Sequence, residues 1–154
     1  MKKSILICLI IASAFSAFSQ TKNDSLYSAV SINDQPLVIA LIKDGADVNY
    51  VKSAGPWVKT NCLLTAVEKG NIDMIRILIE GKVNVNWKDG FNTSAIMYAA
   101  KKGAKDIVVL LLDNGANIKD EDGKGNSVIT AAKESKNKDL VKFVEGKLKE
   151  KEEE

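Results

Sequence analysis

Few residues of this chain have the chemistry needed to bind a metal ion or to catalyse a reaction. Asp120, Glu121 and Asp122 form an acidic run, Asn126 follows closely, and oxygen ligands of this kind suit Ca²⁺. The run lacks the alternating ligand spacing and the bidentate Glu of a calcium loop. We therefore interpret it as a solvated loop tip, and an enzyme that uses these acids is the minor alternative.

Other catalytic signatures are missing from the sequence. The 154 residues include no histidine, and the two cysteines are Cys8 and Cys62. Cys8 lies in a segment that we expect to be removed, which leaves Cys62 without an intramolecular disulfide partner. Its place at a predicted helix start favours a buried thiol over a reactive one, and an intermolecular bridge remains open. Gly123-Lys124-Gly125 resembles a phosphate loop only weakly, because no strand precedes it. We predict a non-enzymatic protein with no metal and no cofactor.

Aromatic residues on loops are the stronger functional signal. Trp57, Trp87 and Phe91 lie on or beside segments with turn residues, and Tyr98 follows in a predicted helix. Tryptophan and tyrosine anchor protein interfaces because they bury a large area and lose few rotamers. For Trp87, structural packing and partner contact are both open. For Trp57 and Phe91 we favour partner contact, because loop tips are exposed.

A repeated helical pattern positions these loops. Lys102 to Asp120 reads KGAKDIVVLLLDNGANIKD, with apolar residues at helical spacing and Gly115 where a helix end needs a positive φ. Asp73, Asp106 and Asp139 stand at the same place in similar segments and recur every 33 residues. A period in the low thirties is typical of stacked-repeat proteins.

The repeated segments resemble the ankyrin family. Leu111 to Ile118 (LLDNGANI) and Ile42 to Asn49 (IKDGADVN) are similar to the end of that family's second helix. The resemblance covers roughly 24–147 and implies an all-α ankyrin-repeat solenoid of about four helix-turn-helix repeats with short β-hairpin loops. The predicted domain spans 20–147, and a charged tail occupies 148–154. The expected repeats are approximately 24–52, 53–89, 90–122 and 123–147.

The helix starts depart from the family's usual Thr-Pro-Leu-His, since the chain lacks His and has no Pro at these places. All four residues at the first position can nevertheless cap a helix N-terminus through a side-chain acceptor. These predicted caps are Asp24, Asn61, Ser94 and Ser127. In the second helices, the predicted buried sets are Leu37, Val38 and Leu41; Met74, Ile75 and Leu78; Ile107, Val108 and Leu111; and Leu140, Val141 and Val144.

Two connections depart from the repeat pattern. The loop between Asn49 and Asn61 is four residues longer than the later ones, and its Gly55-Pro56 marks a turn. Gly81 falls one place early, so the second helix of that repeat is expected to end differently. Asn92 replaces a common glycine and is predicted to adopt a left-handed conformation.

The resemblance implies that hairpin tips and first-helix positions face the same way, toward a partner. Lys101 and Lys102, taken singly, also fit a solvated rim. The candidate partner-binding residues are Trp57, Val58, Thr60, Thr65, Glu68, Lys69, Trp87, Phe91, Thr93, Tyr98, Lys101, Lys102 and Lys124.

The first 19 residues have the three parts of a secretory signal. Lys2-Lys3 is basic, Ile5 to Ala12 is apolar, and Ala17-Phe18-Ser19 ends the segment before Gln20. A membrane anchor would need about 20 continuous apolar residues, and this run is shorter. We therefore predict cleavage near Ser19-Gln20, export to the periplasm or the exterior, and no stable membrane insertion of the mature chain.

The charge balance argues against nucleic-acid binding. Lys and Arg number 22, Asp and Glu number 20, and the two signs are interleaved rather than gathered in a basic stripe. We predict a monomeric module that binds a protein partner whose identity the sequence does not disclose. The alternatives are an immunity or protective protein that neutralises a toxin or shields an envelope enzyme, and a self-assembling structural protein.

Overall fold

The computed structural model describes residues 21–153 of the chain, so the predicted signal peptide over 1–19 lies outside the described residues. Residues 21–31 form the first helix described. The elements that follow are α2 (Gln35–Lys43), β1 (Val51–Ser53), β2 (Lys59–Asn61), α3 (Cys62–Lys69), α4 (Ile72–Glu80), α5 (Ala95–Lys101), α6 (Lys105–Asp113), α7 (Val128–Glu134) and α8 (Lys138–Glu150). Within 21–153, no helix is both long enough and apolar enough to cross a bilayer.

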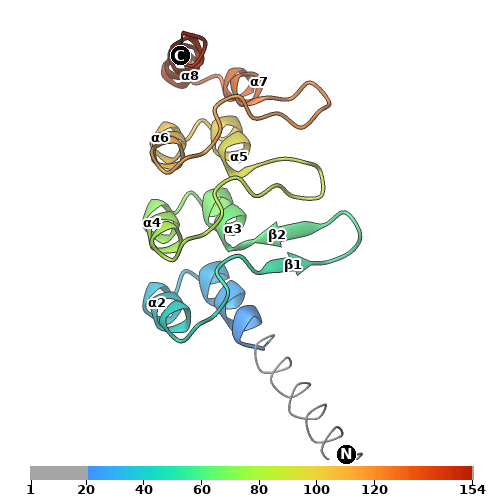
Figure 1. The fold of residues 1–154 in the computed structure, drawn as a ribbon, viewed down its shortest axis with the longest axis vertical. Helices are drawn as coiled ribbons and strands as arrows, with labels where there is room; N and C mark the ends of the chain where they lie inside the picture. Colours follow the sequence, from blue (N-terminus) through green and yellow to red (C-terminus); the bar gives the residue numbers. More distant parts are fainter. Residues whose placement is uncertain (1–20, 154) are drawn as a thin grey trace, which may run out of the picture.

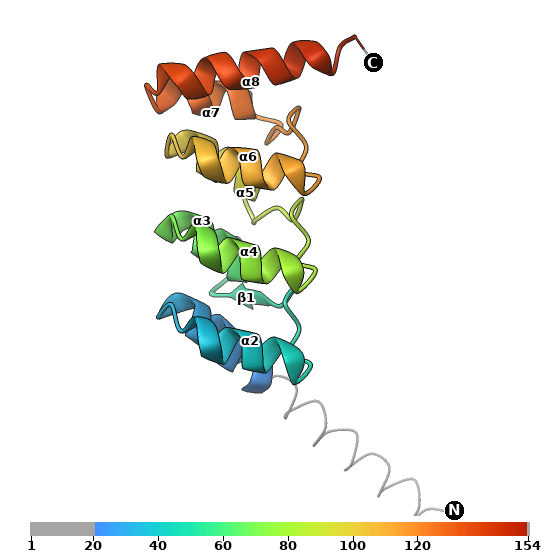
Figure 2. The ribbon, with the colours of Figure 1, turned by 90° about the vertical axis from the view of Figure 1, so that its left-hand side faces the viewer.

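The helices stack in two columns (Figure 1). The helix over 21–31, α3, α5 and α7 form one column, and the hairpin loops project from its side. The other column contains α2, α4, α6 and α8, seen from the front in Figure 2, where α8 is the longest. The predicted architecture, helix pairs joined by hairpin loops, is confirmed.

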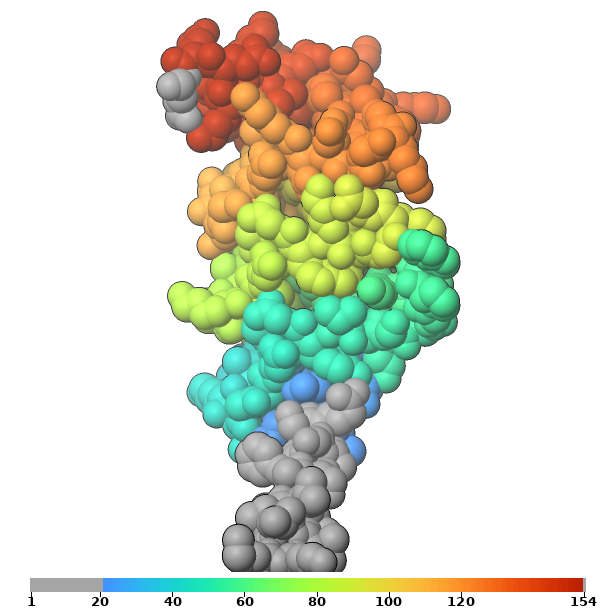
Figure 3. All heavy atoms as spheres, turned by 45° about the vertical axis from the view of Figure 1, so that its right-hand side comes forward, coloured from blue at the N-terminus to red at the C-terminus, as the bar shows by residue number. Residues whose placement is uncertain are grey.

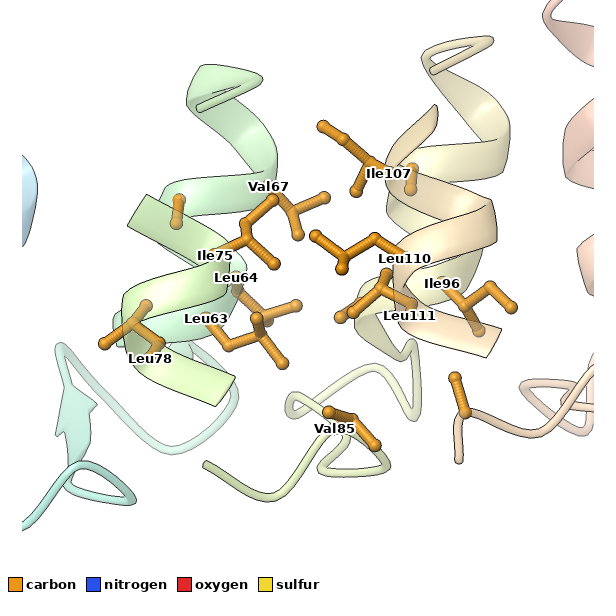
Figure 4. Packing of buried hydrophobic residues seen from close by; sticks show 14 of the residues in the cluster. Leu63, Leu64, Val67, Ile75, Leu78, Val85, Ile96, Ile107, Leu110 and Leu111 are labelled. Carbon is orange, nitrogen blue, oxygen red and sulfur yellow. The ribbon is translucent and has the colours of Figure 1, made fainter. Parts of the chain in front are cut away.

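Apolar side chains between neighbouring helix pairs form one continuous core. Leu63 and Val67 of α3 are buried, as are Leu110 and Leu111 of α6. In Figure 4, Val67 points across the junction between two repeats toward Leu110. Burying a side chain of this size stabilises a fold by roughly 1.5–3 kcal/mol, so each junction contributes to the stability of both repeats.

The predicted buried sets of the second helices are confirmed at nine of the twelve positions and differ at Leu37, Leu41 and Val141. Leu37 is 42% exposed, whereas Met74, at the equivalent place in α4, is 1% exposed. The reason is positional, since no described helix pair covers Leu37. Leu41 and Val141, in the first and last pairs, are half-buried.

Three of the four predicted helix caps occupy the cap position, and one prediction is wrong. The Asn61 side chain accepts a hydrogen bond from the Leu64 N–H at 2.9 Å, and Ser127 forms a capping box with Thr130. Ser94 lies at the cap position of α5 without a side-chain bond. Residues 21–31 are already helical, so Asp24 lies inside the first helix instead of capping it.

Asparagine side chains link the ending of α2 to that of α4, and the ending of α4 to that of α6. The Asn86 side chain donates to the Gly115 carbonyl at 2.9 Å and accepts from the Asn117 N–H at 3.1 Å. Asn49 makes the same pair of bonds with residues 82–84. These bonds satisfy loop backbone groups that the helices leave unpaired.

The end of α4 differs from its neighbours in sequence but keeps their backbone shape. Lys82 has φ 68°, where Gly45 has φ 82° and Gly115 has φ 88°. A left-handed conformation costs a non-glycine residue about 1–2 kcal/mol. Gly81 has an ordinary φ, and a Cβ there would lie 3.2 Å from the Ile42 side chain. The displaced glycine thus permits close packing against α2.

The last helix covers the C-terminal end of the stack. Leu140 and Val144 are its buried residues, whereas Lys138 and Lys142 are exposed. A terminal repeat needs such a polar outer face because no further repeat covers it. Since α8 continues to Glu150, the predicted boundary between repeat and tail after Lys147 falls inside a helix.

Candidate interaction surface

The longest hairpin carries two exposed apolar side chains at its tip. Strands β1 and β2 pair antiparallel, with Val51 opposite Asn61, and the Ala54 N–H continues the ladder to the Val58 carbonyl at 2.9 Å. Trp57 is 69% exposed and Val58 is 55% exposed. The four extra residues seen in the sequence therefore extend the hairpin and hold its apolar tip in solvent.

This hairpin tip lies directly against the next loop. A Cβ built on Gly90 would lie 2.0 Å from the Trp57 carbonyl oxygen, a separation that no side chain tolerates. In Figure 3 the teal-green hairpin lies against the yellow-green segment that follows it. Glycine at position 90 lets the two backbones touch, and the tip with Trp57 is held next to the loop with Phe91, which is 54% exposed.

Asp89 organises the loop that carries Phe91. One carboxylate oxygen accepts from the Phe91 N–H at 2.8 Å and the Thr93 N–H at 2.9 Å, and the other accepts from the Tyr98 hydroxyl at 2.7 Å. Burial, followed by this hydrogen bond, raises the pKa of Tyr98 well above its usual range. Tyr98 is therefore a fixed, protonated side chain. Asn92 has φ 63°, so its predicted left-handed conformation is confirmed.

The acidic run of the following loop is engaged in local structure. Asp120 pairs with Lys88 of the preceding loop. Asp122 accepts from the Asn126 side chain at 2.6 Å and from the Lys124 N–H at 2.7 Å, and these bonds hold its pKa below the ordinary value. Within residues 21–153, no group of three or more His, Cys, Asp or Glu side chains is placed to hold a metal ion.

A cavity of about 330 Å³ lies where α5, α7 and these two loops meet. It brings together five predicted site residues: Phe91, Thr93, Tyr98, Lys101 and Lys124. Its remaining lining residues are Met97, Asp122, Asn126, Ala131 and Glu134. None of these five was among the predicted partner-binding residues, although Asp122 and Asn126 had been considered as metal ligands. Ala131 aligns with Tyr98 one repeat earlier, a register that could have indicated it.

The other predicted site residues lie outside this cavity. Thr65 is only 7% exposed, and its hydroxyl donates to the Asn61 carbonyl at 3.0 Å, so it is not available to a partner. Trp87 is half-buried against the core, which supports the packing interpretation. Glu68, Lys69 and Lys102 are exposed, and Thr60 is half-buried in β2.

Cys62 is fully buried at the first turn of α3. Burial, with a smaller contribution from the charge of Asp47, raises the pKa of the thiol to about 12. Such a group is neutral and inert at neutral pH. The prediction of a buried thiol is confirmed.

The chain matches the family model for ankyrin repeats (3 copies) over residues 26–122 and again over 63–147. Together the two matches cover residues 26–147, which include all or most of every helix described above. A comparison with curated proteins finds none that matches.

Proposed function

Because the chain belongs to the ankyrin-repeat family, whose members are generally protein–protein interaction modules, we propose that it binds a partner protein through its hairpin edge. The contact surface consists of the tips that carry Trp57, Val58 and Phe91, together with the cavity between α5 and α7. Binding is non-enzymatic, and the mature chain acts as a monomer.

The exposed apolar tips are the observation that carries this proposal. Apolar side chains gathered on a protein surface mark interaction sites, because their burial by a partner is favourable. The tips are also held in place. The first hairpin packs against Gly90, and Asp89 accepts hydrogen bonds from the backbone of the loop beside it. A surface ordered in advance loses less conformational entropy on binding.

Site-specific photocrosslinking tests this surface. A photoreactive amino acid at position 57 or 91 is expected to crosslink a discrete partner in the native cell envelope. The matched control places it at Arg76, which is exposed on α4 in the other helix column. Equal crosslinking from all three positions would contradict the assignment.

A triple substitution gives a second test. Replacing Trp57, Phe91 and Tyr98 together by alanine removes the aromatic anchors, so capture of the crosslinked partner should be lost. Circular dichroism should show unchanged helicity, because none of the three lies in the fully buried core. Retained capture with intact helicity would refute the surface.

We also propose that the protein is exported, on the basis of the sequence of residues 1–19. The mature N-terminus should be Gln20, and N-terminal sequencing of protein from the envelope or the medium measures it. A chain that keeps Met1 and stays in the cytoplasm would contradict export.

A protective or immunity role uses the same surface and differs only in the partner. The identity of the crosslinked protein separates it from a general scaffold. Self-assembly is favoured by one observation, the exposed Ile32, Leu37 and Ile39 at the N-terminal end of the described stack. Light scattering of the mature protein distinguishes these states, and we expect the mass of a monomer.

A further inference from the structure

We propose that the C-terminal end of the stack carries a second contact surface, which binds an acidic segment of a protein partner. The surface is a hollow of about 360 Å³ between α7 and the first half of α8, the last two helices in Figure 1. This C-terminal hollow is lined by Lys133, Lys136, Lys138, Val141, Lys142 and Glu145. It shares no residue with the hairpin tips or with the cavity between α5 and α7, so the inference goes beyond the proposed function.

Positive charge dominates the lining of the C-terminal hollow. Four lysines stand against one acid, Glu145, which already pairs with Lys133 at 3.5 Å. The other three lysines, Lys136, Lys138 and Lys142, are exposed and form no ion pair within the described residues. Their ammonium groups are therefore available to a ligand.

The acids around the C-terminal hollow do not cancel this charge. Asp139 lines a separate hollow on another side of α8, and no ion pair joins it to Lys142 in the described part of the chain. Glu134 pairs with Lys101 and lines the cavity between α5 and α7. Even when Asp139 is counted, the four lysines outnumber the acids by two to one. The local charge is thus clearly positive, in a chain whose formal net charge is only +2.

The need for a polar outer face does not explain this charge. The end of a stack must be polar because no repeat covers it, and neutral side chains meet that need. At the other end, the exposed side of the helix over 21–31 carries Thr21, Ser25 and Ser28. Lysines gathered in one hollow repel one another, and a hollow lined by one sign of charge attracts ligands of the opposite sign. The lining therefore favours an anionic ligand.

The distribution of charge along α8 favours a short acidic segment over an extended anionic surface. Beyond the C-terminal hollow, the described lysines and glutamates balance: Lys147, Lys149 and Lys151 against Glu150, Glu152 and Glu153. A membrane or a nucleic-acid duplex lying along α8 would gain little attraction from this second half. A short protein segment needs only the hollow, where the half-buried Val141 and the lysine stems also offer apolar contact.

A panel of short peptides tests the charge requirement. Acetylated and amidated Gly/Ser peptides carry a central run of Glu, Gln or Lys, and fluorescence anisotropy measures their binding to the mature chain. We expect the Glu peptide to bind roughly tenfold more tightly than the Gln peptide, because several exposed charge pairs act together. The Lys peptide should not bind, and added salt should weaken binding of the Glu peptide. Equal binding of the Glu and Gln peptides would overturn the inference.

Paired substitutions tie the binding to the C-terminal hollow. Lys138→Glu with Lys142→Glu should weaken binding of the Glu peptide about tenfold or more, whereas Lys138→Arg with Lys142→Arg should retain it. The matched control, Lys43→Glu with Lys82→Glu, makes the same change in net charge at exposed sites outside α7 and α8 and should leave binding largely unchanged. Circular dichroism should show an intact fold in all three, because the side chains are exposed. Equal losses in the two Glu variants would assign binding to overall charge and overturn the inference.

Vesicles separate a protein segment from a lipid surface. Vesicles of phosphatidylglycerol and phosphatidylcholine present anionic charge without protein, and we expect no cosedimentation of the mature chain at physiological salt. Cosedimentation that is lost in Lys138→Glu with Lys142→Glu would assign the hollow to a lipid surface and overturn the assignment to a protein segment.

The outcomes separate this inference from the proposed function. If positions 57 and 91 crosslink a partner but the Glu peptide does not bind, the hairpin edge stands and the inference is wrong. If the Glu peptide binds through Lys138 and Lys142 and neither position crosslinks, the C-terminal hollow stands and the hairpin edge fails.

Discussion

The two columns of helices, which we call the body of the stack, differ from the loops that project from one of them, which we call the hairpin edge. The difference lies in how far equivalent positions of successive repeats resemble one another. In the body, equivalent positions such as Val38, Ile75 and Val108 are all buried, and asparagine side chains link the endings of α2, α4 and α6 in turn. At the edge, the first hairpin is long and ends in Trp57, whereas the next ends at Phe91. Repetition in the body determines stability, whereas the edge, where the loops differ, is the surface that we propose for recognition.

The physical reason for this difference is the presence or absence of a neighbour. A side chain in the body contacts the adjacent repeat, so its size and polarity are constrained by packing. A side chain at a hairpin tip faces solvent and is free to vary. The contact between Gly90 and Trp57 is an exception, because there two edge loops touch.

Breaking the body should have the largest effect. Leu111→Ala removes a fully buried side chain at a junction between repeats and should lower the free energy of unfolding by about 3–5 kcal/mol. Urea denaturation followed by circular dichroism measures it. Leu112→Ala, at a half-buried neighbour, should cost clearly less; equal losses would mean that the core is not where the structure places it.

Separating the two edge loops should have a smaller effect. Gly90→Ala places a methyl group against the backbone of Trp57. Overpacking of this kind should lower the free energy of unfolding by roughly 1–3 kcal/mol. In a Trp87→Phe background, the fluorescence of Trp57 should report the displaced hairpin. Gly146→Ala is the control, because nothing lies within 4 Å of a Cβ there. An unchanged Trp57 spectrum would argue against the contact.

Removing the hydrogen bonds of one linking asparagine should lower the free energy of unfolding by a still smaller amount. Asn86→Ala deletes the bonds to Gly115 and Asn117 and should lower stability by about 1 kcal/mol, since both groups can bond water instead. Thermal melting measures the change. Lys102→Ala, at an exposed site, should leave the melting temperature unchanged.

Adding the missing N-cap of α6 should raise the free energy of unfolding, by an amount similar to or smaller than the loss expected for Asn86→Ala. Ala104 lies at the N-cap of α6 without a side-chain bond, whereas Asn71 and Asn137 cap α4 and α8. Ala104→Asn should stabilise the protein by up to about 1 kcal/mol. Ala104→Val offers no acceptor and should give no gain in the same melting experiment.

Trimming the edge should affect stability least. Trp57→Ala removes a side chain that is mostly in solvent, so the free energy of unfolding should change by less than about 0.5 kcal/mol. Chemical denaturation checks this, and a loss comparable to that of Leu111→Ala would make Trp57 a core residue.

The sequence predicted the buried positions that recur in every repeat. It did not predict the features that depend on the ends of the stack or on contacts between loops. Ile75 and Val108 are buried as expected because the helical period places them on the inner face. Leu37 was expected to be buried on the same grounds, but periodicity does not reveal which repeat lacks a neighbour. Asp24 matched the cap register, yet the first helix begins earlier than its later counterparts.

The candidate site was predicted only in part. Trp57 and Phe91 were recognised because loop tips are exposed, which holds for both. The close contact between Gly90 and the backbone of Trp57 could not be predicted from the sequence, because it depends on how two loops meet in space. Ala131 gave no chemical signal because its contribution to the cavity is its small size.

The main helix contacts join only elements of the same or adjacent repeats. Such a chain has low contact order, and proteins of this kind form their structure quickly because few distant segments must find one another. Because each helix pair contacts only its neighbours, folding can begin at any pair and spread to the adjacent ones.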